Sequence, residues 1–121
     1  MKRHSAAFER LCDEARAGIE EIDVVTAAAE TDAGRAYLVD VREESEWAAG
    51  HARGAIYLGR GVIERDIEDR IPEKNARILC YCGGGYRSAL VAESLVRMGY
   101  TRVASVAGGW RAWCEADLPT G

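Results

Sequence analysis

The chain has 121 residues, of which 48% are hydrophobic and 30% are charged. This length supports one hydrophobic core and the composition is ordinary for a globular protein, so a single domain over residues 1–121 is predicted. The net charge of −4, without any cluster of lysine or arginine, excludes the usual nucleic-acid-binding classes.

Nothing in the chain predicts an association with membranes. No apolar run approaches the ~20 residues that cross a bilayer. The basic residues 1–4 are followed by Glu9 and Asp13 and not by an apolar stretch, so a secretory signal is not expected. A chain of this size does not need disulfides, so the four cysteines are predicted to be reduced and the protein to be cytoplasmic.

The N-terminal third begins with two helical patterns. Residues 5–17 have apolar side chains at helical spacing, and Gly18 is expected to end this helix. Residues 1–22 are therefore predicted to form a helical extension packed on the domain. Asp23 is a plausible N-cap for a second helix over 24–30.

The middle of the chain alternates strands and helices. Residues 36–41 form a nearly continuous apolar run, which is typical of a strand buried on both faces. A short helix over 43–49 and a strand over 54–58 follow. A helix over 62–71 has isoleucines four residues apart on one side and stops at Pro72.

The C-terminal part continues this alternation with strands over 77–81 and 102–106 and helices over 87–98 and 109–115. Strands that alternate with helices predict an α/β fold with a mainly parallel sheet. In such sheets the site lies beyond the carboxyl ends of the strands.

The most informative segment joins the strand 77–81 to the helix that starts at residue 87. It reads Cys82-Gly83-Gly84-Gly85-Tyr86-Arg87-Ser88. A glycine-rich loop at a helix N-terminus can turn several backbone N–H groups toward one point, which is how the main chain builds an anion site. The loop is therefore predicted to bind an anion.

Cys82 is the candidate nucleophile, at the solvent-facing mouth of this loop. The glycines let the loop curl around it, Arg87 adds a fixed positive charge, and residues 88–91 include no acidic side chain. These features favour the thiolate, which is the nucleophilic form of cysteine. By contrast, Cys12, Cys80 and Cys114 are interpreted as buried structural cysteines.

Two chemistries use a cysteine in an anion-binding loop closed by arginine: phosphoryl or arsenate transfer, and sulfur transfer through a persulfide. A phosphatase loop of the Cys-x5-Arg type wraps a tetrahedral oxyanion, whereas the segment from Cys82 to Arg87 is one residue shorter. Tyr81 stands where such a phosphatase has histidine, and no clear general acid is present. The shorter loop suits a single sulfur atom and favours sulfur transfer.

Further segments of the chain are similar to segments of a known family. Residues 38–55 are similar to a family segment that reads Asp-Val-Arg-Glu, then Glu, then Gly-His-Ile-Pro-Gly-Ala. Residues 82–88 are similar to its Cys-x4-Arg-Ser loop, and Gly99-Tyr100 and residues 106–110 are similar to its ending. From about residue 23 to 118, the chain resembles the single-domain rhodaneses.

This resemblance implies a rhodanese-like fold, with a central, mainly parallel five-stranded sheet flanked by helices on both faces. It also implies a sulfurtransferase that moves a sulfane sulfur from thiosulfate or a persulfide donor to a thiol, including a protein thiol, or to cyanide. Cys82 would carry the sulfur as a persulfide, the loop N–H groups would hold the terminal sulfur, and Arg87 would steady the anion. The reaction needs no cofactor and no metal.

The resemblance also suggests roles for residues outside the loop. Asp40 and Arg42 resemble family residues that brace the loop, although ordinary surface charges are the alternative. Persulfide exchange needs no general base, so His51 is interpreted as stabilising a turn. Trp110 and Trp113 are interpreted as covering the core.

Three questions stay open at this level. Arg87 is the one cation of the loop sequence, so a low-molecular-weight or protein persulfide competes with thiosulfate as the donor. The domain could instead be a non-catalytic module or a sulfur carrier docked to a larger assembly. A phosphatase or arsenate reductase on the same scaffold is the less favoured enzyme.

Overall fold

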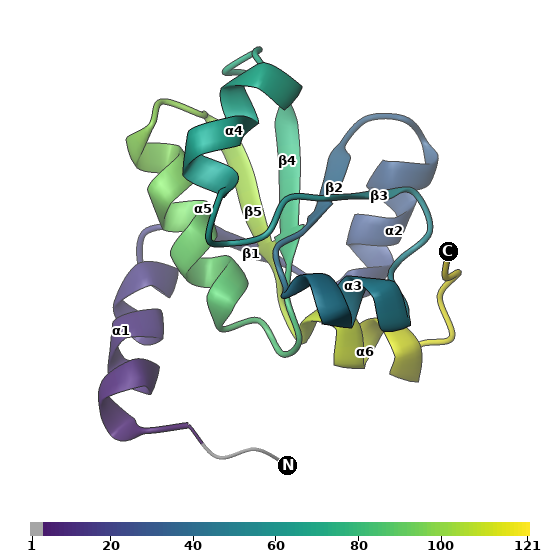
Figure 1. Ribbon diagram of the computed structural model, residues 1–121, viewed down its shortest axis with the longest axis horizontal. Helices are drawn as coiled ribbons and strands as arrows, with labels where there is room; N and C mark the ends of the chain where they lie inside the picture. The colour runs from purple at the N-terminus through teal and green to yellow at the C-terminus, as the bar shows by residue number, and fades with distance from the viewer. Residues whose placement is uncertain (1–3) are drawn as a thin grey trace.

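The computed structural model describes residues 4–121, so residues 1–3 of the predicted extension lie outside the described residues. Five strands form one sheet in the order β1-β5-β4-β2-β3, and every neighbouring pair is parallel (Figure 1). The strands are β1 (Glu20–Ile22), β2 (Tyr37–Asp40), β3 (Ala55–Tyr57), β4 (Arg77–Tyr81) and β5 (Arg102–Val106). The predicted α/β fold with a parallel five-stranded sheet is confirmed.

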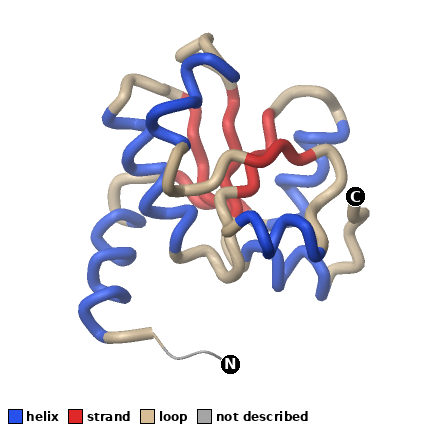
Figure 2. The backbone as a smooth tube through the Cα atoms, in the orientation of Figure 1, coloured by secondary structure: helices blue, strands red, loops and turns tan. Residues whose placement is uncertain are grey.

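Helices cover both faces of this sheet, as expected (Figure 2). They are α1 (Ala6–Arg16), α2 (Val24–Asp32), α3 (Glu44–Ala49), α4 (Ile63–Arg70), α5 (Arg87–Arg97) and α6 (Gly109–Glu115). Helices α4 and α5 pack on one face, and α2 and α6 pack on the other. Within residues 4–121, no helix is both long enough and apolar enough to span a membrane.

The buried strands supply apolar side chains to both faces. Val39 and Cys80 point into the core under α4 and α5, whereas Leu38, Leu79 and Tyr81 point into the core under α2 and α6. Successive residues of a strand face opposite sides of the sheet, so a strand buried on both faces needs a continuous apolar run. This confirms the prediction made for residues 36–41.

Strand β1 was not predicted. Its two glutamates are exposed, so the segment lacks the apolar pattern that identifies a buried strand. It forms the sheet edge by pairing with β5 from Glu20↔Ala104 to Ile22↔Val106. Arg77 of β4 forms an ion pair with Glu20 at 2.7 Å, which helps to hold this edge strand on the sheet.

Helix α1 packs against α5 and not on the sheet itself. Ser5 caps α1 by accepting a hydrogen bond from the Phe8 N–H at 3.1 Å. Cys12 and Ala15 are fully buried in a small apolar cluster that includes Ala89 and Leu90 of α5. The N-terminal segment therefore reaches the start of α5, next to the glycine loop.

Candidate active site

Cys82 directly follows the central strand β4, between the ends of β5 and β2, and α5 starts five residues later. This is the carboxyl edge of the sheet, where the sequence placed it. The first turn of α5 holds no acidic residue, so the positive end of the helix is not compensated there.

The sulfur of Cys82 is enclosed by hydrogen-bonding groups. The Gly85 N–H donates to the Cys82 Sγ at 3.1 Å, and the Ser88 Oγ lies 3.4 Å from the same atom. The Ser88 Oγ in turn lies 2.8 Å from the Ser105 Oγ, and both serines are fully buried. Two hydroxyl groups in series can therefore deliver a hydrogen bond to a thiolate. Ser105 was not anticipated, because a lone serine within an apolar strand carries no signal.

The expectation that Cys82 faces solvent was wrong. Only 1% of the residue is exposed, because the loop folds over it, although its side chain still lines the pocket described below. Cys12 and Cys80 are buried as expected, and burial raises the pKa of both thiols, that of Cys80 to about 12. Cys114 is exposed, which corrects its interpretation as a buried cysteine.

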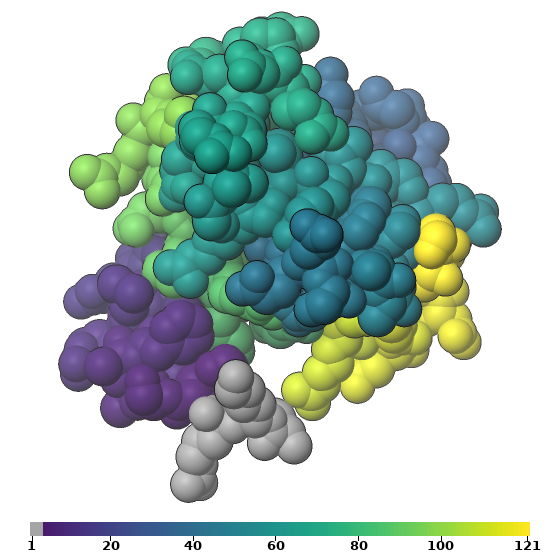
Figure 3. Space-filling view, in the orientation of Figure 1, coloured from purple at the N-terminus to yellow at the C-terminus, as the bar shows by residue number. Residues whose placement is uncertain are grey.

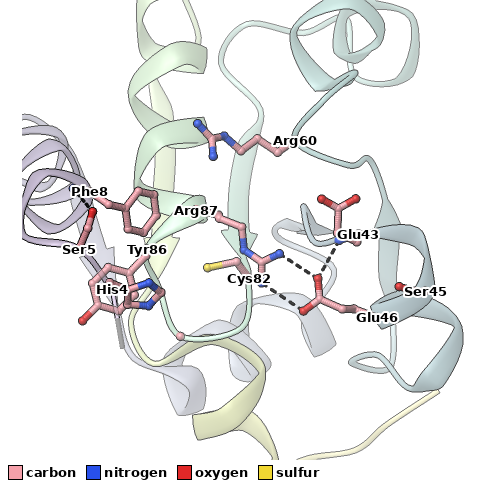
Figure 4. Close-up of a pocket in the computed structure, with 11 residues that line it drawn as sticks. His4, Ser5, Phe8, Glu43, Ser45, Glu46, Arg60, Cys82, Tyr86 and Arg87 are labelled. Atoms are coloured by element: carbon pink, nitrogen blue, oxygen red, sulfur yellow. Dashed lines mark hydrogen bonds and ion pairs between the residues drawn. The ribbon is translucent and has the colours of Figure 1, made fainter. Parts of the chain in front are cut away.

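A pocket of about 790 Å³ opens beside this sulfur (Figure 4). Four segments line it: the start of the chain, the region of α3, the loop before α4, and the glycine loop. The lining residues are His4, Ser5, Phe8, Glu43, Ser45, Glu46, Arg60, Cys82, Gly84, Tyr86 and Arg87. Among residues 4–121, no group of histidine, cysteine or acidic side chains is arranged to hold a metal ion.

Arg87 reaches the pocket paired with a carboxylate. Its two terminal nitrogens donate to the Glu46 oxygens at 2.8 and 3.2 Å. The hydrogen bond from Arg87 lowers the pKa of Glu46 to about 2 and raises the pKa of Arg87. Both side chains are therefore charged at neutral pH. Glu46 lies within the segment that carries the family resemblance, but its contact with the loop could not be read from the sequence.

Asp40 and Arg42 are not surface charges, because both are almost completely buried. The Arg42 guanidinium donates to both Asp40 oxygens, with the shortest distance 2.8 Å, and to the Gly50 carbonyl at 2.6 Å. The Tyr81 hydroxyl donates to Asp40 at 2.7 Å. The pair therefore supports the residue before Cys82 and the turn after α3, without a hydrogen bond to residues 83–88.

His51 and the tryptophans lie in that supporting structure. The His51 ring stacks on Trp47 at 3.5 Å, and its Nδ1 lies 3.1 Å from the Trp47 carbonyl oxygen, within the turn after α3. Trp113 is buried in the core under α2 and α6. Trp110 is half-buried and covers the Arg42 guanidinium at 4.9 Å.

The start of α6 holds the backbone of the loop. The Trp110 N–H donates to the Cys82 carbonyl at 2.7 Å, and the Arg111 N–H donates to the Gly83 carbonyl at 3.1 Å. This approach requires a glycine at position 109, where φ is +52° and a Cβ atom would overlap the Cys82 carbonyl. Gly85 is similarly restricted, with φ at +94°.

We expect Gly109→Ala to destabilise the protein by about 1–3 kcal/mol, because the methyl group would push α6 away from the loop. Urea unfolding followed by circular dichroism measures this. Gly61→Ala is the matched control, because a Cβ atom there meets nothing within 4 Å. Equal stability of the two variants would show that α6 does not hold the loop.

Comparison with known proteins covers most of the chain. Residues 21–116 match the model of the rhodanese-like domain family. The thiosulfate sulfurtransferase GlpE of Vibrio cholerae is 34% identical over 98 residues, covering 81% of this chain and 91% of that protein. The GlpE protein of Haemophilus influenzae is 36% identical over 84 residues, covering 69% and 78%.

A solved structure is similar along the whole chain. It is a protein of unknown function from Rhodopseudomonas palustris, described as a possible tyrosine phosphatase. The identity is 29% and the TM-score 0.85, covering 100% of this chain and 99% of that one.

Proposed function

The chain belongs to the rhodanese-like domain family, and on that basis we propose that it is a sulfurtransferase that carries a sulfane sulfur on Cys82. The observation that supports this most directly is the setting of the Cys82 sulfur. It accepts the Gly85 N–H, lies beside the Ser88 hydroxyl and faces an open pocket. The rest of the loop around this sulfur consists of Gly83, Gly84, Tyr86 and Arg87.

In the first step, the Cys82 thiolate attacks the outer sulfur of the donor. A bond forms between the Cys82 Sγ and that sulfur, the donor S–S bond breaks, and the leaving group departs with the electron pair. The leaving group is sulfite when the donor is thiosulfate and a thiolate when the donor is a persulfide. The backbone N–H groups of the loop and the positive, N-terminal end of α5 stabilise the persulfide anion that remains.

In the second step, a thiolate or cyanide attacks the terminal sulfur. The bond between this sulfur and the Cys82 Sγ breaks, and Cys82 leaves as a thiolate with the electron pair. The products are an acceptor persulfide or thiocyanate, and the free enzyme is restored. The four free cysteines fit the reducing cytoplasm in which this cycle would run.

Two features argue against phosphoryl transfer, despite the description of the Rhodopseudomonas palustris protein. The loop from Cys82 to Arg87 has six residues, one fewer than a loop of the Cys-x5-Arg type. The Glu46 carboxylate forms an ion pair with Arg87, which is the cation that a phosphate dianion would need. Hydrolysis of an aryl phosphate faster than sulfur transfer to cyanide would reverse this choice.

Intact mass spectrometry tests the proposal directly. Incubation with thiosulfate or an organic persulfide should add the mass of one sulfur atom, and cyanide should then remove it. A protein that gains sulfur from neither donor would contradict the proposed function.

The Arg87–Glu46 pair makes a separate prediction about thiosulfate. Removing the Glu46 charge leaves Arg87 free for the donor dianion, so Glu46→Gln should lower the KM for thiosulfate by about two- to fivefold. The glutamine can still accept the hydrogen bond that the Glu43 N–H donates to Glu46 at 3.0 Å, so α3 should keep its cap. Steady-state kinetics with cyanide as the acceptor measure the effect.

Glu44→Gln removes the same charge from an exposed site on α3 outside the pocket, and it serves as the control. An unchanged or higher KM in Glu46→Gln would show that the carboxylate does not oppose the donor.

A further inference from the structure

The N-terminal segment contributes to the pocket although it precedes the family match, which begins at residue 21. Two hydrogen bonds join α1 to the catalytic loop. Arg16 donates to the Gly85 carbonyl at 3.0 Å, and the Cys12 thiol donates to the Tyr86 carbonyl at 3.5 Å. Helix α1 is therefore fixed relative to the loop that holds the reactive sulfur.

Three rings from these segments form one side of the pocket, here called the aromatic wall: His4, Phe8 and Tyr86. The His4 ring lies 4.3 Å from the Tyr86 ring and 5.1 Å from the Phe8 ring, and the Phe8 and Tyr86 rings are 6.1 Å apart. The Arg16 guanidinium stacks 4.6 Å from the centre of the Tyr86 ring and keeps this ring in place.

The opposite side of the pocket is charged. Glu43, Glu46, Arg60 and Arg87 line it, and the Glu46–Arg87 pair fixes two of these charges at 2.8 Å. Figure 4 shows the Cys82 sulfur between the two sides, pointing toward Phe8 and Tyr86 and away from Glu46. In Figure 3, the purple α1 and the blue segment that includes α3 flank the green surface between them.

This arrangement does not match a small inorganic dianion. Thiosulfate gains little from aromatic rings, and the charged side carries two glutamates against two arginines, so it offers a dianion no net positive charge. The pocket of about 790 Å³ is of the size that holds organic ligands. A persulfide with a carbon group would place that group on the rings and its terminal sulfur beside Cys82.

We infer that the aromatic wall binds the carbon group of an organic persulfide donor. This inference rests on the proposed sulfurtransferase function and adds the class of donor. The Cys82 thiolate attacks the terminal sulfur of RSS⁻, the bond between the two donor sulfurs breaks, and RS⁻ leaves with the electron pair. The wall binds R before this step and releases it afterwards.

Benzenethiosulfonate and methanethiosulfonate are stable probes for this subsite. Both are monoanions with the same transferable sulfur and a sulfinate leaving group, and they differ in the organic group. The readout is the ratio of kcat/KM for the benzene donor to kcat/KM for the methane donor, with thiocyanate formation measured. Intrinsic reactivity cancels when a variant is compared with the wild type.

We expect Phe8→Ala to lower this ratio by about three- to tenfold, because one ring of the wall is lost. Leu11→Ala is the matched control, because Leu11 is on the same helix but 49% exposed and outside the pocket, and it should leave the ratio unchanged. If Phe8→Ala does not fold, the same ratio is measured for His4→Ala. His4 precedes α1, so its replacement removes less packing than that of Phe8.

The outcomes separate this inference from the proposed function. A ratio that falls in Phe8→Ala or His4→Ala but not in Leu11→Ala supports the subsite. A ratio that stays at the wild-type value in both wall variants overturns the subsite, even if sulfur transfer proceeds. Absence of transfer from every donor to the wild type overturns the proposed function itself.

Discussion

Replacing Cys82 with serine is expected to reduce sulfur transfer to the background rate in a protein that remains folded. A serine cannot hold the S–S bond of the persulfide, and its hydroxyl is not ionised at neutral pH. The serine hydroxyl can still accept the Gly85 N–H and meet the Ser88 hydroxyl, so little stability should be lost. Intact mass after incubation with thiosulfate or an organic persulfide, alongside thiocyanate formation, measures the loss.

Cys80→Ser is the matched control, because Cys80 stands two residues away on β4 and is fully buried. Burial raises the pKa of its thiol to about 12, so Cys80 is neutral at pH 7 and is not expected to react. The variant should keep sulfur transfer and lose about 1–3 kcal/mol of stability through the buried hydroxyl. A folded but inactive Cys80→Ser, or sulfur uptake by Cys82→Ser, would move the nucleophile to Cys80.

Asp40→Ala is expected to lower the free energy of unfolding by about 3–5 kcal/mol, because it leaves the Arg42 guanidinium buried without its counter-ion. The variant also removes the acceptor of the Tyr81 hydroxyl, which lies 2.7 Å from Asp40. Three segments meet at this carboxylate: the ends of β2 and β4 and, through Arg42, the turn at Gly50. Urea unfolding at pH 7 measures the change.

An exposed ion pair provides the comparison for Asp40→Ala. Asp66 pairs with the neighbouring Arg65 at 2.7 Å on the surface of α4. Three quarters of the Arg65 side chain and about a third of the Asp66 side chain remain exposed to water, so Asp66→Ala should change the unfolding midpoint much less than Asp40→Ala. Similar midpoints for Asp40→Ala and Asp66→Ala would show that the buried pair does not hold these segments together.

Local patterns were sufficient for most of the fold and for the position of the loop. Within residues 4–121, all six helices and four of the five strands begin and end near their predicted bounds. These elements carry their own signals, such as the Asp23 side chain, which accepts the Thr26 N–H as an N-cap at 2.7 Å. Strand β1 has no such signal, because two exposed glutamates become a strand only by pairing with β5.

The candidate site divides in a similar way. Cys82, the glycines and Arg87 lie within six residues of the sequence, so they could be proposed as a site before the fold was known. Two partners come from elsewhere in the chain. Glu46 pairs with Arg87 from 41 residues away, and Ser105 contacts Ser88 from 17 residues away. No local pattern indicates either contact, because a contact between distant segments depends on how the sheet is assembled.

By itself, the sequence determined the α/β alternation, the position of the loop and Cys82 as the candidate nucleophile, because backbone periodicity, glycine freedom and side-chain chemistry act locally. The tertiary structure alone decided which charged side chains are buried or paired and which remain available to a ligand. It buried the Asp40–Arg42 pair, placed Glu46 against Arg87 and enclosed Cys82. It also brought α1 beside the loop, so that Phe8 lines the same pocket as Cys82. These outcomes depend on packing between segments far apart in the chain, which sets the burial and the neighbours of each group.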